Sequence, residues 1–141
     1  MSRDEIEALV AHRQVAWDAG DAHALAQDHS EDCIVDSPLG GGETKGREAI
    51  ERLYATYFRA FTDLKMERKD LLIDGQRAAL HATASGTDHG GFMGMAPTKR
   101  GVRISIVFMY AFENGLIAHE RRIYDFTGLL VQVGMLKAKP V

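Results

Sequence analysis

The spacing of apolar residues predicts two helices at the start of the chain. Apolar side chains recur every three or four residues from Ile6 to Trp17, after a capping-box pattern that begins at Ser2. Gly20 then permits the left-handed turn that commonly ends a helix. A second, short helix is expected to run to about Gln27. Both helices precede every strand that we predict.

A strand and a long amphipathic helix follow. Cys33–Val35 is typical of a strand, and Pro38 ends it. From Arg47 to Phe61 the apolar residues again keep a 3.6-residue period, and many of them are aromatic. This second long helix is therefore expected to bury an aromatic face.

The second half of the chain is typical of antiparallel strands. The dipeptides Asp74-Gly75 and Asn114-Gly115 are strong hairpin-turn signals. They separate four predicted strands, at about 63–73, 76–88, 99–113 and 116–125. The glycine-rich run Gly90–Gly94 suggests a mobile flap, and the apolar tail from Gly128 suggests a docked helix or an interface segment. Helices followed by an antiparallel sheet predict an α+β fold, with a curved sheet packed on helices around a pocket.

Composition limits the functions that this fold could serve. A length of 141 residues favours one domain over 1–141, and 45% apolar with 26% charged residues is ordinary for a globular protein. A net charge of −3 without a basic stripe argues against nucleic acid as a partner. The sequence shows no secretory layout and no membrane-length apolar run, so we expect a cytoplasmic protein. The single cysteine, Cys33, is expected to fill the core.

Asp125 is the candidate for chemistry that strand register suggests. If Asn114-Gly115 is a two-residue loop, Asp125 faces Ile104, and its other neighbours on that face are Val102, Ile106 and Ile123. Desolvation among aliphatic side chains would raise the pKa of the carboxyl group, which suits a general acid or base. The alternative is that Asp125 caps the terminal helix.

Two further polar residues are candidates for supporting roles. Arg121 would share the face of Asp125, opposite Phe108, and could orient a ligand, or it could be a solvated or interface arginine. His89, in the glycine-rich run, could carry a proton over the pocket or be an exposed loop residue. The histidines lack metal-ligand spacing, and the glycine clusters lack the motifs of phosphate-binding loops, so we expect no metal and no cofactor.

Several runs together resemble the SnoaL-like polyketide cyclases of the nuclear transport factor 2-like, or ketosteroid isomerase-like, superfamily. They are Gly86–Gly94, Phe112–Gly115 and Tyr124–Leu130, with Asp36-Ser37-Pro38 and Gly46–Ile50 upstream. The resemblance implies a cone-shaped, cystatin-like fold that forms a homodimer through the outer face of its sheet. It also implies that Asp125 matches the acidic residue that serves those cyclases as general acid/base in an aldol closure.

The chain departs from these families at three positions. The cyclases' Gly-Thr-His is Gly86-Thr87-Asp88 here, and their His-Trp pair on the last strand is Glu120-Arg121. Ser37 occupies the position that resembles the base of ketosteroid isomerase. Related limonene epoxide hydrolases use two carboxylates and an arginine, and the chain has these residue types without that family's spacing.

We therefore predict a cofactor-free enzyme, an aldol-type cyclase or an isomerase, that acts on a hydrophobic carbonyl compound of aromatic, polyketide-like or steroid-like type. The alternatives are a non-catalytic ligand-binding or interaction module and an epoxide hydrolase-like enzyme. Asp125 buried in the pocket would favour the enzyme, and Asp125 capping the terminal helix would favour the binding module. The predicted catalytic residues are Asp125, His89 and Arg121, and the predicted pocket residues are Trp17, Ser37, Tyr54, Phe58, Ile104, Ile106 and Ile123.

Overall fold

A computed structural model describes residues 1–39 and 41–139 of the chain. Its helices are α1 (Arg3–Ala19), α2 (Ala22–Gln27), α3 (Arg47–Ala60) and α4 (Phe126–Gln132). Its strands are β1 (His29–Ser37), β2 (Gly42–Lys45), β3 (Lys65–Asp74), β4 (Arg77–Thr87), β5 (Gly101–Glu113) and β6 (Leu116–Tyr124). The predicted α+β class is confirmed.

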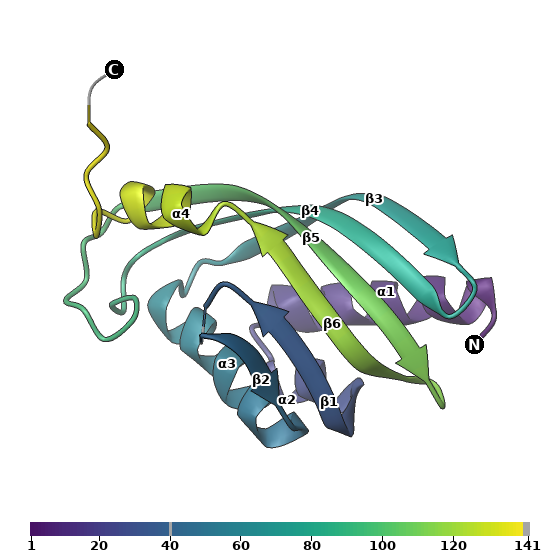
Figure 1. Ribbon diagram of the computed structural model, residues 1–141. Coiled ribbons are helices and arrows are strands. Elements are labelled where there is room, and N and C mark those ends of the chain that lie inside the picture. Colours follow the sequence, from purple (N-terminus) through teal and green to yellow (C-terminus); the bar gives the residue numbers. More distant parts are fainter. Residues whose placement is uncertain (40, 140–141) are drawn as a thin grey trace.

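The strands form one curved sheet in the order β2-β1-β6-β5-β4-β3. Helices α1, α2 and α3 lie on one face of this sheet, and α4 follows β6 at one end (Figure 1). Neighbouring strands are antiparallel except β1 and β6, which are parallel. The prediction of an antiparallel sheet is wrong at that pair, because β1 reaches the sheet through a helical crossover rather than a hairpin. Strand β2 was not predicted.

Local sequence signals set the first helix ends as expected. The Ser2 hydroxyl accepts a hydrogen bond from the Glu5 amide at 3.1 Å, and Gly20 adopts a left-handed φ of 65°. Asp21 caps α2 by accepting a hydrogen bond from the Ala24 amide at 2.9 Å. These contacts satisfy helix-terminal groups that would otherwise lack a partner.

The core lies between the helices and the inner face of the sheet, and aromatic rings form one group within it. Trp17 of α1 meets Tyr54 and Phe58 of α3 edge to face, with ring centroids 5.4 and 5.6 Å apart. Phe108 of β5 completes this group from the sheet. The amphipathic faces predicted for α1 and α3 are confirmed, and the two faces meet at this group. Within the described residues, no helix is long and apolar enough to cross a membrane.

An irregularity in β6 decides which of its side chains point inward. Next to the Asn114-Gly115 turn, Phe112 pairs with Ile117, as the two-residue loop predicts. The following pair is Ala111 with His119, so Ala118 is an extra residue in β6. Because neighbouring side chains of a strand point to opposite faces, this bulge reverses the inward and outward positions beyond it. The predicted register for the rest of β6 is wrong by one residue.

Candidate active site

A small cavity lies between the helices and the inner face of the sheet. Its walls come from α1, α3, the segment after α3, strands β3–β6 and α4, and its volume is about 60 Å³. Nearly all of the wall is apolar. The wall residues include Trp17, Tyr57, Phe61, Met66, Ile104, Ile106, Phe108, Arg122, Tyr124 and Leu129. The arrangement is that of a hydrophobic ligand site with few polar groups.

Two polar residues of β6, Arg122 and Tyr124, are among the wall residues. The Nη2 atom of Arg122 and the hydroxyl of Tyr124 are buried, and neither has a hydrogen-bond partner among the described residues. The Tyr124 hydroxyl lies near Tyr57 and Ser37 without a hydrogen bond of good geometry. Since buried polar groups are nearly always paired, these two suit a ligand oxygen.

Behind Arg122 lies a group of buried polar residues, the Glu120 cluster, formed by Arg13, His29, Tyr54, Glu120 and Arg122. One Glu120 carboxylate oxygen accepts from the Arg122 Nε, and the other lies 3.1 Å from the His29 Nε2 and 3.9 Å from the Arg13 Nη2. Arg13 donates to the Tyr54 hydroxyl at 2.7 Å, and the Arg122 guanidinium lies 4.8 Å from the centre of the Tyr54 ring. Side chains from α1, β1 and α3 thus converge on one segment of β6.

Charge pairing keeps the cluster ionised despite its burial. Burial alone would raise the pKa of Glu120, but Arg122, His29 and Arg13 lower it well below the usual 4.5. Burial also disfavours the charged form of Arg122, yet Glu120 raises its pKa above the usual value. Burial lowers the pKa of His29 below 6.5. Around neutral pH the cluster holds a carboxylate and two guanidinium groups, and burial favours the uncharged form of the His29 imidazole.

Asp125 does not lie where register predicted. Its side chain is exposed, and its Oδ1 accepts a hydrogen bond from the Gly128 amide at 2.8 Å, as the N-cap of α4. The predicted surroundings of Asp125 are wrong because the bulge brings Tyr124, not Asp125, opposite the inner face of β5. The cap is the alternative arrangement that the sequence left open, and the one expected to favour a binding module.

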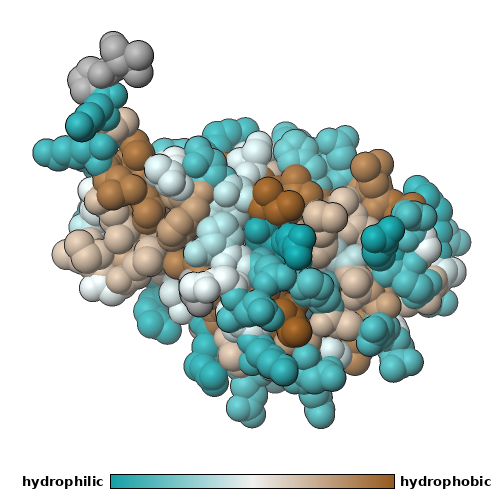
Figure 2. All heavy atoms as spheres, in the orientation of Figure 1, coloured by the Kyte–Doolittle hydropathy of each residue, from teal (hydrophilic) through white to brown (hydrophobic). Residues whose placement is uncertain are grey.

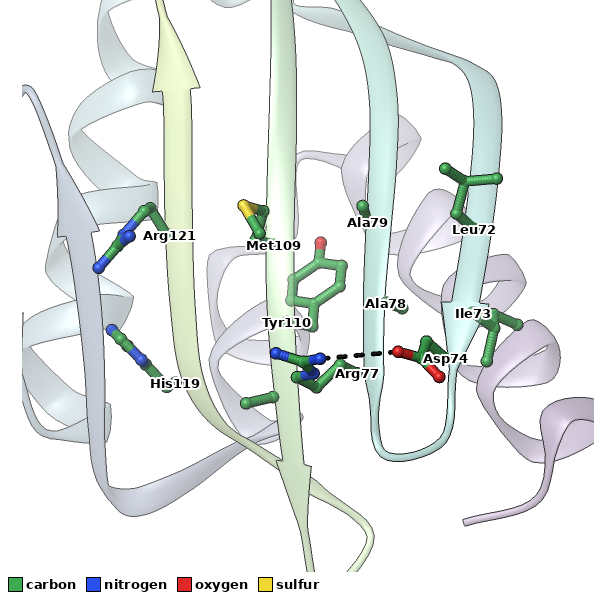
Figure 3. A pocket seen from close by; sticks show the side chains of 11 residues that line it. Leu72, Ile73, Asp74, Arg77, Ala78, Ala79, Met109, Tyr110, His119 and Arg121 are labelled. Atoms are coloured by element: carbon green, nitrogen blue, oxygen red, sulfur yellow. Dashed lines mark ion pairs between the residues drawn. The ribbon is translucent and has the colours of Figure 1, made fainter.

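Arg121 and Ile123 also point away from the cavity, for the same reason. Arg121 pairs with Met109 rather than with Phe108, and its guanidinium lies 3.7 Å from the Asp36 carboxylate on the outer face. Ile123 is 51% exposed. Arg121 lines an open groove of about 390 Å³ on that face, together with Leu72 and Met109 (Figure 3). The predicted inward positions of both residues are therefore wrong.

The segment that carries His89 is anchored to the end of α3. The buried Asp88 carboxylate accepts hydrogen bonds from Gly91 and Thr98, at 2.9 to 3.0 Å, and Phe92 is fully buried. A Cβ atom at Gly90 would lie 1.9 Å from the Arg59 carbonyl oxygen, so only glycine fits there. These contacts favour a fixed loop over the predicted flap, and the His89 side chain is exposed outside the cavity wall.

The other predicted pocket residues divide between the wall and the layer behind it. Trp17, Ile104 and Ile106 lie on the cavity wall. Tyr54 is buried in the Glu120 cluster, and the remaining two, Ser37 and Phe58, are not on the wall. Burial raises the pKa of the Cys33 thiol to about 11, which suits a core residue rather than a nucleophile.

Sequence reasoning missed the polar residues that face the interior, Glu120, Arg122 and Tyr124. One signal was present in α1, where Arg13 occupies a position on the otherwise apolar face formed by Ile6, Val10 and Trp17. An arginine in that position needs a buried acceptor, and the chain supplies Glu120 and Asp28. Among the described residues, no group of three or more histidine, cysteine, aspartate or glutamate side chains is placed to hold a metal ion.

Comparison with solved structures finds the same fold in several bacterial proteins. AclR, a proposed hydroxylase from Streptomyces galilaeus, is 28% identical, with a TM-score of 0.84 over 99% of this chain and 87% of its own. TsrD from Streptomyces laurentii is 24% identical, with a TM-score of 0.84 over 96% and 99% of the two chains. IdmH, a proposed polyketide cyclase from Streptomyces antibioticus, is 25% identical, with a TM-score of 0.73 over 89% and 95%.

Comparison with curated proteins gave no match. The profile of one protein family, described as SnoaL-like polyketide cyclase, matches residues 8–133. That span runs from α1 through α4 and includes the inner cavity, the Glu120 cluster and the capped start of α4. Together with the curved mixed sheet and the helices on one of its faces, this match shows that the chain belongs to the SnoaL-like polyketide cyclase family.

Proposed function

We propose that the protein is an enzyme that binds a hydrophobic carbonyl compound in the inner cavity and moves a proton to or from carbon. The observation that carries this proposal is that two residues of an otherwise apolar wall, Arg122 and Tyr124, each have a buried polar atom without a hydrogen-bond partner among the described residues. Both are hydrogen-bond donors, and a carbonyl oxygen accepts two such bonds. A polyketide-like aromatic ketone has the required combination of apolar rings and carbonyl oxygens.

The chemistry follows from where charge develops. Removing a proton from the carbon beside a carbonyl places negative charge on the oxygen, and Arg122 would stabilise that enolate. The enolate carbon then forms a bond to a second carbonyl carbon of the same molecule, whose oxygen takes up a proton. If the proton returned instead to a different carbon of the conjugated enolate, the reaction would be an isomerisation. Burial raises the pKa of Tyr124, so its hydroxyl stays protonated and acts as a donor.

The proton acceptor in this proposal is Asp125, in a form of the protein opened by substrate. A cavity of about 60 Å³ is much smaller than the roughly 300–1,000 Å³ of typical ligand pockets, so a wall must move. Leu129 of α4 is part of that wall, and the Asp125 carboxylate holds the first turn of the same helix. Displacement of α4 would widen the cavity and release the carboxylate from the Gly128 amide beside Tyr124.

The test is a screen of aromatic and polycyclic ketones, ketoesters and epoxides with the wild type and single variants. Arg122→Gln should lower kcat by about 10²- to 10³-fold on any ketone that reacts, as expected for loss of an oxyanion donor. Arg121→Gln, the neighbouring arginine on the outer face, is the matched control and should keep wild-type rates.

Three outcomes of this screen would change the proposal. Equal rates in Arg122→Gln and the wild type would remove the carbonyl site. Full activity of Asp125→Asn would remove the proton acceptor but leave the carbonyl site in place. Tight binding of ketones without turnover would favour the binding module, and turnover of epoxides alone would favour the epoxide hydrolase-like alternative.

We also propose that the protein forms a homodimer through the outer face of the sheet. That face carries exposed apolar side chains on three strands: Leu72 is 71% exposed, Met109 46% and Ile123 51%. Figure 2 shows brown apolar areas beside teal polar ones on the face that β4, β5 and β6 turn to the viewer. Side chains of this kind on one face commonly mark an interface between proteins.

Sedimentation velocity tests the homodimer. Met109→Glu places a charge in the proposed interface and should convert dimer to monomer at micromolar protein. Met93 is another exposed methionine, and it does not line the groove. Met93→Glu is therefore the matched control and should leave the dimer unchanged. A wild type that sediments as a monomer would overturn this assembly without affecting the cavity.

A further inference from the structure

The Glu120 carboxylate is fully buried and does not reach the cavity wall. It contacts the Nε of Arg122 and leaves the Nη2 of the same guanidinium without a partner among the described residues. The His29 Nε2 lies 3.1 Å from the second carboxylate oxygen, and its Nδ1 lies 3.1 Å from the Leu25 carbonyl oxygen. The carboxylate is thereby fixed between β1 and the guanidinium that it contacts.

Among the described residues, the Arg122 side chain has no other polar partner that would fix its direction. Its remaining close neighbours are aromatic faces, with the guanidinium 4.8 Å from the Tyr54 ring centre and 5.8 Å from those of Tyr57 and Phe108. Stacking on rings limits the plane of a guanidinium but lets it slide and turn. The Nε contact with Glu120 is the directional one.

We propose that Glu120 is a positioning residue, which holds Arg122 so that its Nη2 stays at the cavity wall to bind the ionised oxygen of an aromatic enol or phenol. The inference rests on the proposed function and specifies its ligand class. An ionised oxygen next to flat rings matches one strong cationic donor on a wall made of aromatic and aliphatic side chains. Glu120 acts through Arg122 and does not touch the ligand.

Glu120 could affect an anionic ligand either by positioning Arg122 or through its own negative charge, and an experiment can separate these two roles. A buried carboxylate next to the site makes the potential there more negative, which opposes an anionic ligand. Neutralising Glu120 in place would therefore strengthen the binding of an anion if charge alone mattered. If Glu120 positions Arg122, neutralising it weakens the same binding. The two roles predict changes of opposite sign.

The experiment uses 2-naphthol, whose neutral and ionised forms differ in absorbance and fluorescence, as the probe. Its dissociation constant and the pH at which the bound form ionises are measured for the full chain. In the wild type the bound probe should ionise at lower pH than free 2-naphthol. Arg122→Gln should abolish that shift, and Arg121→Gln should retain it.

Glu120→Gln is the deciding variant. Positioning predicts that the bound probe ionises nearer the pH of free 2-naphthol and that naphtholate binds about ten-fold more weakly, a usual loss for one charge-assisted hydrogen bond. Glu113→Gln, at an exposed glutamate on β5, controls for the loss of a negative charge and should behave as the wild type. Tighter binding of naphtholate by Glu120→Gln would overturn the positioning role while leaving Arg122 as the anion site.

His29→Asn tests the same inference in case Glu120→Gln fails to fold. The shorter amide can still face the Leu25 carbonyl but cannot reach Glu120, so both charged partners remain and only the support of the carboxylate is lost. The bound probe should again ionise nearer the free value. An unchanged ionisation in a folded His29→Asn protein would contradict the role assigned to the cluster. If the wild type does not bind 2-naphthol, or Arg122→Gln binds it equally well, the proposed ligand site itself fails.

Discussion

Strand β6 carries two charged clusters on opposite faces, and their surroundings differ. On the inner face Glu120 and Arg122 are fully or almost fully buried, within reach of His29. On the outer face Asp36 of β1 contacts His119 at 2.7 Å and Arg121 at 3.7 Å, and the Arg121 side chain is 58% exposed. Each cluster combines a carboxylate, an arginine and a histidine.

The difference shows why similar contacts have different consequences. Water competes for exposed ion pairs and screens them, so the outer cluster adds little to stability or specificity. Inside, burial removes the charges from bulk water, so each charge needs a partner in the protein. The inner cluster holds a buried guanidinium with one donor, the Arg122 Nη2, left without a partner among the described residues. Three of the four predictions below test this contrast, and the other tests the cap that follows β6.

The largest expected effect is on stability after removal of one inner charge. Arg122→Leu leaves Glu120 buried without its closest partner, and we expect the free energy of unfolding to fall by about 3–5 kcal/mol. Arg121→Leu on the outer face should cost less than about 1 kcal/mol. Urea unfolding of both variants at pH 7 measures the difference. Equal losses would show that the two clusters do not differ in the way we describe.

The second prediction concerns removal of both inner partners. Glu120→Leu/Arg122→Leu leaves neither charge unpaired, so it should be more stable than Arg122→Leu by at least about 1 kcal/mol. Arg13 keeps Asp28, Tyr54 and the Leu25 carbonyl as partners in this variant. Urea unfolding of the wild type, both single variants and the double variant completes the cycle. A double variant that is less stable than either single one would contradict it.

Much of the fold could be predicted from the sequence, because helix caps, periodicity and turns are local signals. The face of β6 could not, since Ile117 and Ile123 stand six residues apart, an even spacing that a regular strand places on one face. The bulge at Ala118 breaks that regularity and puts Ile123 outside. As a result, Glu120, Arg122 and Tyr124 face the interior. A prediction that places apolar residues inside does not choose these polar residues.

Asp125 shows the same limit at the end of β6. The sequence offered both a base and a helix cap, and the choice depended on a register that one inserted residue changes. By contrast, the inward alternation of β5, with Ile104 and Ile106 on the cavity wall, follows from its apolar pattern because that strand is regular. Local chemistry could be predicted where the backbone is regular, and the interior polar residues required the structure.

The third prediction concerns Asp125, which belongs to neither cluster. Asp125→Ala removes the acceptor for the Gly128 amide and should lower stability by about 1 kcal/mol, whereas Asp125→Asn keeps a capping oxygen and should cost only a few tenths. Thermal unfolding of both variants measures this. A large loss in Asp125→Asn would indicate that the carboxylate has a partner besides the cap.

The smallest expected effect is a change in how stability depends on pH. Burial lowers the pKa of His29 in the folded protein below its unfolded value of about 6.5. Acidification from that pH therefore protonates the unfolded chain before the folded one, and stability falls. The lowered pKa of Glu120 acts in the same direction at lower pH, from about 4.5 downward. The wild type should thus lose stability steadily as the pH falls below 6.5.

Comparison of the inner and the outer histidine isolates the first of these contributions. His29→Asn removes a group that resists protonation, so the decline in stability between pH 6.5 and 5 should become shallower than in the wild type. His119→Asn removes the histidine of the outer cluster and shows whether loss of any histidine beside a carboxylate has this effect. Urea unfolding at half-unit pH steps gives the slopes. A steeper decline in His29→Asn would mean that His29 is protonated more readily in the folded protein than in the unfolded chain, with Glu120 outweighing burial.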